Sequence, residues 1–352
     1  MRKKLKIAIL SPFEETVPPE KYGGTELVVY NLVEGLTRRG HKVTLLASGD
    51  SRVSARLIPI FKEPLRGKGG MSDLKTREAY KFVGVARVIE FLKGEEFDVV
   101  HNHIGWRILT FSRLISYPLI TTLHGPLDIG YQQFVYSQFP KANYISISNN
   151  QRKPLAHKLN FVATVYNGIE VEKFTFINRP GEYLAFLGRM SSEKGPIHAI
   201  EVAKRSGMKL VMAAKVDLTD QKFYQGEVEP LIDGKQIKFI GEVDHVGKNR
   251  LLKNAAALLV PIQWEEPFGL YMIEAMACGT PVIAFDRGAV REIVVDGRTG
   301  FICKNISEMT EAVKRIGEIN REDCRKHVEK NFTVQKMVDG YEEAFKKLVF
   351  NY

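Results

Sequence analysis

Residues 266–282 read Glu266-Pro-Phe-Gly-Leu-Tyr-Met-Ile-Glu274 and continue as Ala-Met-Ala-Cys-Gly-Thr-Pro-Val. The apolar run that opens with Phe268-Gly269 predicts a helix that ends near Cys278, where glycine and then proline follow. Glu266 therefore precedes this helix and Glu274 lies inside it. A helix start offers unpaired N–H groups to a phosphate or sugar oxygen, and a nearby carboxylate can accept from hydroxyl groups. The stretch favours a sugar-nucleotide site over two solvated glutamates at a helix end.

Short apolar runs alternate with helical patterns on both sides of this stretch. The chain opens with a strand at 5–10, a helix at 25–39 and a strand at 43–47, which is the start of a parallel α/β sheet. After a polar break at 178–181 the pattern begins again with a strand at 183–187. Further strands are predicted at 98–101, 119–123, 144–147, 162–166, 210–213, 237–240, 257–262 and 282–285, with a last helix at 334–348. Two α/β domains in tandem, with ligands bound at the carboxyl ends of their strands in a cleft between them, are the simplest account.

Length and composition fit a two-domain globular protein. The chain has 352 residues, 44% of them hydrophobic, and no apolar stretch approaches the roughly 20 residues that a membrane-spanning helix needs. Its three cysteines, Cys278, Cys303 and Cys324, are scattered and lack metal-type spacing, which fits the reducing cytosol. We expect a cytoplasmic protein with no resident metal.

Most of the net charge of +10 lies in the first half of the chain. Residues 1–170 contain 24 basic and 15 acidic residues, whereas the remainder contains 27 and 26. Residues 51–93 alone hold ten basic residues against four acidic ones. This asymmetry predicts a basic surface for an anionic partner, such as a lipid-linked phosphate, a membrane surface or a charged glycan, beside the plainer alternative of a solvated lysine-rich face. Few aromatic residues are interleaved there, so nucleic acid is the less favoured partner.

A second charged loop follows the strand at 183–187. Arg189 and Lys194 leave this loop after Gly188, before a helix that is predicted to begin at Pro196. Arginine as a planar fork and lysine as a point charge could together neutralise a diphosphate while its bond to a sugar breaks. Such a clamp would do the work that a metal ion does elsewhere. Taken alone, the two residues would more often be ordinary surface charges.

Two strand ends in the first half carry further candidates. Gly23 and Gly24 precede the helix at 25–39, where they would let the backbone approach an anion, but they do not form the G-x-G-x-x-G pattern of a dinucleotide site. His124 follows the strand at 119–123 directly and could hold a sugar hydroxyl or assist a proton transfer. His101 and His103 follow the strand at 98–101 in the same way. Histidines in such loops are more often structural.

These segments in order resemble family 4 of the retaining glycosyltransferases, along essentially the whole chain. The resemblance rests on Glu266-x7-Glu274 with its continuation to Ala284, and on Gly188-Arg189-x4-Lys194-Gly195. Supporting motifs are Gly23-Gly24, His124-Gly125, Asn167-Gly168-Ile169 and residues 296–301. The family implies the GT-B fold, in which two Rossmann-like parallel-sheet domains face each other across a cleft. It implies an acceptor domain at 1–175, a donor domain at 176–332 and a final helix at 333–352 that crosses back to the first domain.

The resemblance also implies roles for individual residues. His124, Glu266, Arg189 and Lys194 would be catalytic, with the two cations on the donor diphosphate. The donor site would also include Gly23, Gly24, Gly188, Phe268, Gly269, Leu270 and Glu274, with Glu274 on the ribose, and acceptor contacts would come from Thr25, His103 and Asn167. Pro267 replaces a glycine that many relatives have, and proline removes one backbone N–H there.

The expected activity is therefore metal-independent, retaining transfer of a hexose-type unit from a nucleotide-diphosphate sugar, of UDP or GDP type, to a glycan, lipid-linked or small-molecule hydroxyl. No bound cofactor is expected. Two alternatives remain open at this point: a sugar phosphorylase or nucleotide-sugar epimerase of the same fold, and a non-catalytic protein that binds sugar nucleotides or nucleic acid. Peripheral contact with an anionic membrane, through the basic first half, is a further expectation.

Overall fold

The computed structural model describes residues 4–350 except 22, 67–70 and 72. It divides into two compact units, which are described separately. Unit 1 is Met1–Gly168 with Val334–Tyr352, and unit 2 is Ile169–Thr333. The last helix therefore belongs with the first part of the chain, and the division at residue 168 precedes the polar break at 178–181.

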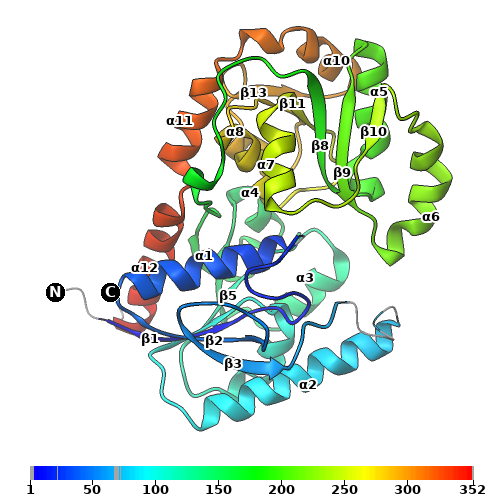
Figure 1. The fold of residues 1–352 in the computed structure, drawn as a ribbon. Coiled ribbons are helices and arrows are strands. Elements are labelled where there is room, and N and C mark those ends of the chain that lie inside the picture. Colours follow the sequence, from blue (N-terminus) through cyan, green and yellow to red (C-terminus); the bar gives the residue numbers. More distant parts are fainter. Residues whose placement is uncertain (1–3, 22, 67–70, 72, 351–352) are drawn as a thin grey trace. The chain divides into compact units, whose positions relative to one another are not determined.

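Unit 1 is a seven-stranded parallel sheet in the order β3-β2-β1-β4-β5-β6-β7. Helices α1 and α12 lie on one face and α2 on the other (Figure 1), so the central strands are buried on both faces. Strand β1 is mostly apolar, whereas β4 and β5 end in buried polar residues. The strands are β1 (Lys6–Leu10), β2 (Lys42–Ser48), β3 (Arg56–Phe61), β4 (Val99–Asn102), β5 (Leu119–Thr122), β6 (Asn143–Ser146) and β7 (Asn160–Thr164). The helices are α1 (Gly24–Arg38), α2 (Leu74–Lys93), α3 (Gly130–Ser137), α4 (Asn149–Arg152) and α12 (Val334–Phe350), with a 3-10 segment at Gly105–Leu114.

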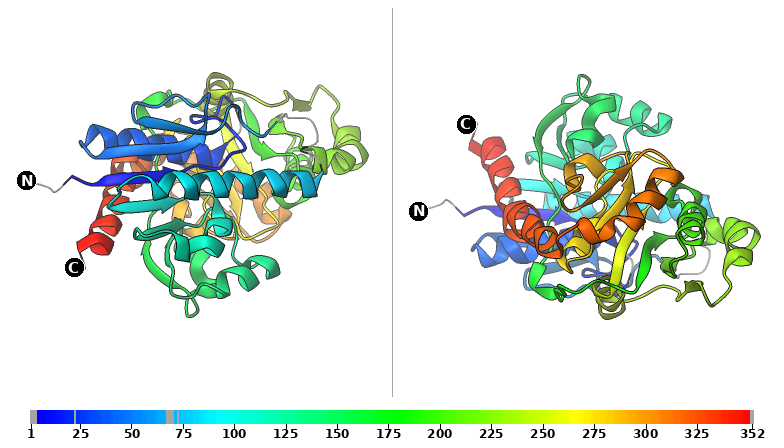
Figure 2. Two further views of the ribbon diagram at one scale, coloured as in Figure 1. Left: turned by 90° about the horizontal axis from the view of Figure 1, so that it is seen from below. Right: turned by 90° about the horizontal axis from the view of Figure 1, so that it is seen from above.

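Unit 2 is a six-stranded parallel sheet in the order β10-β9-β8-β11-β12-β13. Helices α5 and α10 pack together on one face, and α8 packs with α7 and α11 on the other (Figures 1 and 2). The strands are β8 (Tyr183–Arg189), β9 (Leu210–Lys215), β10 (Ile237–Phe239), β11 (Ala255–Val260), β12 (Val282–Phe285) and β13 (Gly300–Cys303). The helices are α5 (Pro196–Ser206), α6 (Gln221–Phe223), α7 (His245–Lys253), α8 (Leu270–Ala277), α9 (Val290–Ile293), α10 (Ile306–Lys314) and α11 (Arg321–Asn331).

Each sheet has a point at which its strand order reverses. In unit 1 this point lies between β1 and β4, and in unit 2 it lies between β8 and β11. In open parallel sheets ligands bind outside the carboxyl ends of the strands at such reversals. Most of the candidate residues end or follow these four strands, or β5 beside them, whereas Asn167 follows the edge strand β7.

The sequence-based assignments are confirmed for most elements, including two parallel-sheet domains of Rossmann type. Several details differ, among them β13, which was not predicted, and β11, which begins two residues earlier than predicted. Arg189 is the last residue of β8 and does not lie in the loop after it, and β7 begins at Asn160, two residues earlier than predicted. The basic segment 51–93, which was interpreted by charge alone, contains β3 and α2.

Candidate active site

Arg189 ends β8 with its guanidinium between two carboxylates. It forms an ion pair with Glu193, and its Nε lies 3.2 Å from Oδ2 of Asp220, which ends a short 3-10 turn at Leu218–Asp220. Burial raises the pKa of Asp220 above its usual range, and the charge of Arg189 opposes that rise. The guanidinium is one-third exposed, so it remains open to a ligand at the end of β8.

Lys194 and Glu266 form a nearly buried ion pair that joins the segments after β8 and β11. The same oxygen of Glu266, Oε2, accepts from the hydroxyl of Tyr271 at 2.9 Å and from the indole Nε1 of Trp264 at 3.3 Å. The ammonium group of Lys194 also lies 4.9 Å from the ring centre of Trp264 and 5.1 Å from that of Tyr271. Two aromatic rings thus hold both members of the pair, since a cation is attracted to a ring face.

The two segments also meet through their backbones. The N–H of Gln263 donates to the carbonyl of Glu193 at 2.7 Å. Gly195 has a φ of +70°, and a Cβ at this position would lie 2.0 Å from the carbonyl oxygen of Pro261. Glycine is required here for both reasons, so the motif Lys194-Gly195 fixes the distance between the end of β8 and the end of β11.

Helix α8 begins directly after the second carboxylate segment. Gly269 is its N-cap with a φ of +90°, and Phe268 before it is buried against Phe332. The first helical residue is Leu270, two residues later than the apolar pattern suggested. Glu274, in the middle of the helix, is 3% exposed and forms an ion pair with Lys248 of α7. The described residues of unit 2 therefore bring Arg189, Lys194, Glu266 and Glu274 to the region around the ends of β8 and β11.

In unit 1 three histidines form one hydrogen-bonded chain. His124 Nε2 lies 2.8 Å from Nδ1 of His103, and Nε2 of His103 lies 3.2 Å from Nδ1 of His101. Burial lowers the pKa of all three rings, and that of His124 to about 4, so each is neutral near pH 7. Both ring nitrogens of His103 are thus hydrogen-bonded to other histidines. The sequence analysis expected His103 to contact the acceptor substrate instead.

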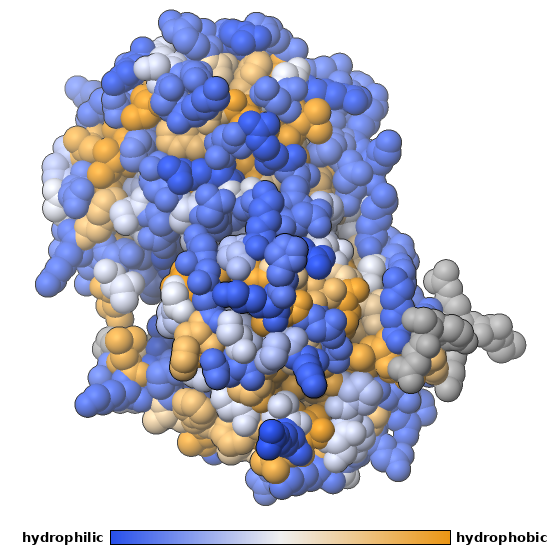
Figure 3. Space-filling view, turned by 180° about the vertical axis from the view of Figure 1, so that it is seen from behind, coloured by the Kyte–Doolittle hydropathy of each residue, from blue (hydrophilic) through white to orange (hydrophobic). Residues whose placement is uncertain are grey.

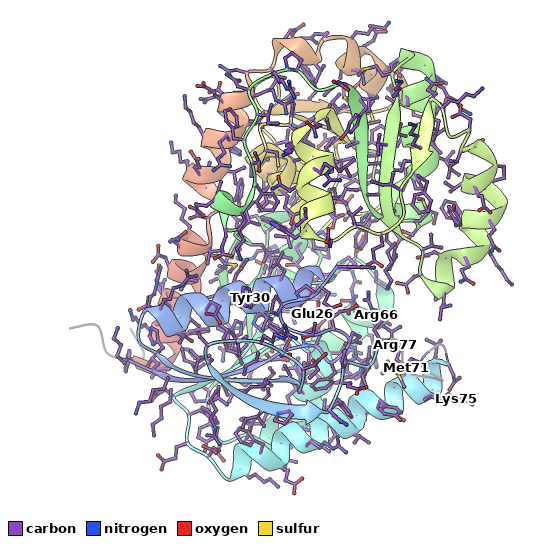
Figure 4. All side chains as sticks on the ribbon, in the orientation of Figure 1. Glu26, Tyr30, Arg66, Met71, Lys75 and Arg77 are labelled. Atoms are coloured by element: carbon purple, nitrogen blue, oxygen red, sulfur yellow. The ribbon has the colours of Figure 1, made fainter. Side chains whose placement is uncertain are left out.

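The remaining candidates of unit 1 lie at the start of α1 and near Gly168, where the first segment of this unit ends. Gly23 is the N-cap of α1, and Thr25 is half-buried in its first turn. Asn167 is 4% exposed, and its Oδ1 has no hydrogen-bond partner among the described residues. Glu26, one residue after Thr25, is 6% exposed, and burial raises the pKa of its carboxyl to about 7. Figure 4 shows Glu26 and Tyr30 on α1, and the charge of nearby Arg66 opposes the rise in the pKa of Glu26.

Sequence reasoning missed several of these neighbours. Trp264 and Tyr271 lie two before and five after Glu266, and an aromatic pair at this spacing could have been noticed. Asp220 and Lys248 lie far in the sequence from their partners Arg189 and Glu274, and no local sequence pattern predicts these contacts. Among the described residues, no group of three or more His, Cys, Asp or Glu side chains is arranged to hold a metal ion.

Comparison with known proteins identifies the family. The model of glycosyl transferases group 1 matches residues 170–332, and the model of glycosyltransferase family 4 matches residues 22–173. The chain belongs to glycosyltransferase family 4. Phosphatidyl-myo-inositol mannosyltransferase of Mycobacterium leprae is 26% identical over 324 residues, which cover 85% of this chain and 83% of that protein.

Solved structures agree on the GT-B fold of this glycosyltransferase. Sucrose-phosphate synthase from Thermosynechococcus elongatus matches with a TM-score of 0.80 at 19% identity, over 98% of this chain and 99% of the other. Anabaena HepE in complex with UDP-glucose matches with a TM-score of 0.77 at 17% identity, over 98% and 100%. At these identities the likeness concerns the fold.

Proposed function

We propose that this glycosyltransferase is a retaining, metal-independent enzyme that moves a hexose-type unit from a nucleotide-diphosphate sugar to a hydroxyl acceptor. The donor would be of UDP or GDP type, and the acceptor a glycan, a lipid-linked sugar or a small molecule. One observation carries the proposal: Arg189 and the Lys194–Glu266 pair stand at the ends of β8 and β11, where the strand order of unit 2 reverses.

The two cations suit a diphosphate. Arg189 donates a hydrogen bond to Glu193 and forms an ion pair without a hydrogen bond with Asp220, and Lys194 donates to Glu266, so each cation lies beside an anionic oxygen. Phosphate oxygens accept the same charge-assisted hydrogen bonds. A diphosphate bound to both cations would keep its developing negative charge stabilised as the bond to the sugar breaks, which is the largest requirement of the reaction.

The two glutamates would then divide the donor between them. Glu274, on α8, would accept hydrogen bonds from the ribose hydroxyls. Glu266, next to Lys194 and before the backbone of Phe268, Gly269 and Leu270, would contact the transferred sugar and the phosphate beside it. In the front-face route, the bond from the anomeric carbon to the diphosphate breaks while a bond to the acceptor oxygen forms on the same face. The acceptor proton passes to the departing phosphate oxygen, so no protein nucleophile takes part.

Residues of unit 1 would complete the site. His124 would meet the donor sugar near the reacting carbon, and Gly23 and Gly24 would allow the start of α1 to approach the phosphates. Thr25, His103 and Asn167 would contribute on the acceptor side. Asn167 is favoured by its buried and unpartnered Oδ1, which could accept from an acceptor hydroxyl.

A donor panel tests the proposal. Thermal shift and turnover are measured with UDP-, GDP- and ADP-sugars for the wild type, Arg189→Ala and Lys194→Ala. We expect one donor class to stabilise the wild type, and each variant to lose about 10- to 100-fold in donor affinity, as the loss of a charge-assisted hydrogen bond implies. Arg315→Ala is a matched control, because Arg315 pairs with Glu318 on the exposed surface of unit 2.

Specific results would contradict each part. If no nucleotide sugar binds and both variants match Arg315→Ala, the transferase proposal fails; phosphate-dependent cleavage of a disaccharide would favour a phosphorylase. The anomeric configuration of the product, read by NMR, decides between retention and inversion. Unchanged turnover in excess chelator is expected for a metal-independent reaction.

We also propose peripheral contact of unit 1 with an anionic membrane. The first half of helix α2 exposes apolar side chains, among them Leu74 (70% exposed) and Val83 (48% exposed), and the surface of this unit carries apolar groups among hydrophilic ones (Figure 3). Four basic residues of segment 51–93 are paired with carboxylates, namely Arg56, Arg66, Arg77 and Lys81. Arg52, Lys62, Lys75 and Lys93 are exposed and have no carboxylate partner among the described residues, so these cations are available to lipid headgroups.

A further inference from the structure

The histidine chain of unit 1 ends at a hydroxyl pair beneath helix α12. His101, the innermost ring, has its Nε2 2.7 Å from Oγ1 of Thr122, and this hydroxyl donates to the phenol oxygen of Tyr341 at 3.4 Å. His101 belongs to β4 and Thr122 to β5, which are neighbouring parallel strands, and Tyr341 comes from α12. The order Tyr341, Thr122, His101, His103, His124 therefore forms one hydrogen-bonded relay from the C-terminal helix to the predicted catalytic histidine.

The inner part of the relay is shielded from water. His101 and Thr122 are at most 1% exposed, and Tyr341 is fully buried. The rings of Tyr341 and Phe345 lie 5.0 and 5.1 Å from the ring of His101. Water therefore does not reach the inner end of the relay and cannot supply or accept a proton there. The outer end differs, because His124 is partly exposed and its Nδ1 has no hydrogen-bond partner in the described part of the chain.

Neutral rings in such a chain cannot choose their tautomers independently. Each neutral imidazole carries one N–H and one acceptor nitrogen, and each hydrogen bond needs one donor. If the tautomer of one ring is fixed, the nitrogen of the next ring that faces a donor must accept, and the one that faces an acceptor must donate. The tautomer of each ring along the chain is fixed in turn. Only two arrangements satisfy every bond, and they differ in whether Nδ1 of His124 carries a proton.

The hydroxyl of Thr122 selects between these arrangements. Its single hydrogen is directed to Tyr341, so its oxygen must accept from Nε2–H of His101. Nδ1 of His101 then accepts from Nε2–H of His103, and Nδ1 of His103 accepts from Nε2–H of His124. The outward nitrogen of His124, Nδ1, is left as a hydrogen-bond acceptor.

We propose that Tyr341, Thr122, His101 and His103 are positioning residues that hold His124 in the tautomer with an unprotonated Nδ1 and fix the plane of its ring. This inference rests on the proposed function, in which His124 faces the donor sugar. An acceptor nitrogen there orients a sugar hydroxyl by accepting a hydrogen bond from it, whereas the opposite tautomer could only donate a hydrogen bond. Helix α12, at the far end of the chain, thereby acts on the site through the relay.

The tautomer can be measured directly in the free protein. Two-bond ¹H–¹⁵N NMR correlations of histidine-labelled protein distinguish protonated from unprotonated ring nitrogens, and loss of one signal in His124→Gln assigns it among the eight histidines. We expect Nδ1 of His124 to be unprotonated in the wild type. In Tyr341→Phe the hydroxyl of Thr122 is released to donate to His101, so the relay should reverse and Nδ1 of His124 should become protonated.

Matched variants separate this effect from damage to the core. Tyr144→Phe removes another buried phenol of unit 1, which donates to the carbonyl of Phe139 at 2.9 Å away from the relay, and should leave the His124 signals unchanged. Thr122→Ser keeps the hydroxyl and should keep the wild-type tautomer, whereas Thr122→Val should give a mixture. The proposal is overturned if Nδ1 of His124 is protonated in the wild type, or if its state is the same in Tyr341→Phe and Thr122→Val as in the wild type.

Transfer kinetics test the consequence for function. With a donor found in the panel, Tyr341→Phe should lower kcat about tenfold with little change in the KM of the donor, and Tyr144→Phe should not. If Tyr341→Phe reverses the tautomer of His124 but leaves kcat unchanged, the relay has no role in sugar transfer. If no donor is ever turned over, the proposed function fails while the NMR result still decides the relay.

Discussion

At the residue scale, the two glutamates of the opening motif differ in their surroundings although both are buried beside a lysine. Glu266 receives three donors on one oxygen, two of them from aromatic residues that also surround Lys194. Glu274 is held by Lys248 from another helix. A carboxylate in a rigid aromatic frame suits the reacting end of the donor, and one on a helix face suits the ribose.

This difference predicts separable kinetic effects. We expect Glu274→Gln to raise the KM of the donor about 10- to 100-fold with a small effect on kcat, since binding in the ground and transition states is weakened equally. Glu266→Gln should lower kcat by a similar factor. Steady-state kinetics measure both, and Glu311→Gln is the control because Glu311 pairs with Lys314 on the surface. Equal effects of both site variants on kcat would contradict the division of roles.

Glu26 gives a prediction about pH. Its pKa is raised from 4.5 to about 7, chiefly by burial and further by the charges of Glu14 and Glu15, while Arg66 opposes the rise. Below pH 4.5 the folded and unfolded carboxyls are both neutral, so folding is not penalised. As the pH rises to about 7 the unfolded carboxyl ionises first, and the folded protein loses up to about 3 kcal/mol of stability.

Glu26→Gln should therefore be more stable than the wild type at pH 8.5, by up to about 3 kcal/mol, and no more stable at pH 4.5. Denaturant unfolding at the two pH values measures this difference. Glu90→Gln, an exposed carboxyl of α2, should show no such pH-dependent gain. A gain that is equal at both pH values would mean that the ionisation of Glu26 is not its cause.

At the element scale, the connection after β8 depends on one glycine. Gly195→Ala would place a methyl group 2.0 Å from the carbonyl oxygen of Pro261 and would strain a backbone at a φ of +70°. Gly207 at the end of α5 has a φ of +71° with open space around it, so Gly207→Ala carries the backbone strain alone.

We expect Gly207→Ala to lower the free energy of unfolding by about 1–2 kcal/mol, the ordinary cost of a left-handed residue with a side chain. Gly195→Ala should cost clearly more and should also weaken donor binding, because Lys194 moves with it. Denaturant unfolding and donor titration test both variants. Equal losses of stability would show that contact with Pro261 does not determine the loop.

Most elements of the fold could be predicted from the sequence. Short, nearly continuous apolar runs identified nearly every central strand, because the strands of a parallel sheet covered on both faces consist of such runs. Strand β3 was missed: Pro59 interrupts it, and proline is tolerated there because β3 is an edge strand with a register shift beside that residue.

The site was predicted in part for a similar reason. Arg189, Lys194, Glu266 and Glu274 stand in two local motifs, so the sequence alone could point to them. The relay from Tyr341 to His124 could not be found in this way, because it joins β4, β5 and a helix more than 200 residues later. Ring contacts of this kind are decided by the arrangement of the strands and α12, which no local pattern specifies.

At the scale of the whole molecule, charge is distributed differently from what composition indicates. The excess of ten basic residues over four acidic ones in segment 51–93 is reduced by partners outside it, such as Glu14, Glu15 and Glu95. No helix among the described residues is both long enough and apolar enough to cross a bilayer. Contact with a membrane would therefore depend on a few unpaired cations and on the exposed apolar side chains of α2.

Lys75 is the most informative of these cations, because it stands in the first turn of α2 next to the exposed Leu74 (Figure 4). A basic residue near an anionic bilayer contributes about 1 kcal/mol, so Lys75→Gln should lower partitioning onto anionic vesicles about fivefold. Leu74→Ser should lower it further by removing apolar contact. Vesicle sedimentation with phosphatidylserine-containing and purely zwitterionic vesicles measures both effects, and Lys314→Gln, an exposed lysine of unit 2, is the control. Equal partitioning onto the two kinds of vesicle, or equal behaviour of Lys75→Gln and Lys314→Gln, would exclude α2 as the contact; a salt-dependent loss confined to Lys75→Gln would support it, since only exposed charge is screened by salt.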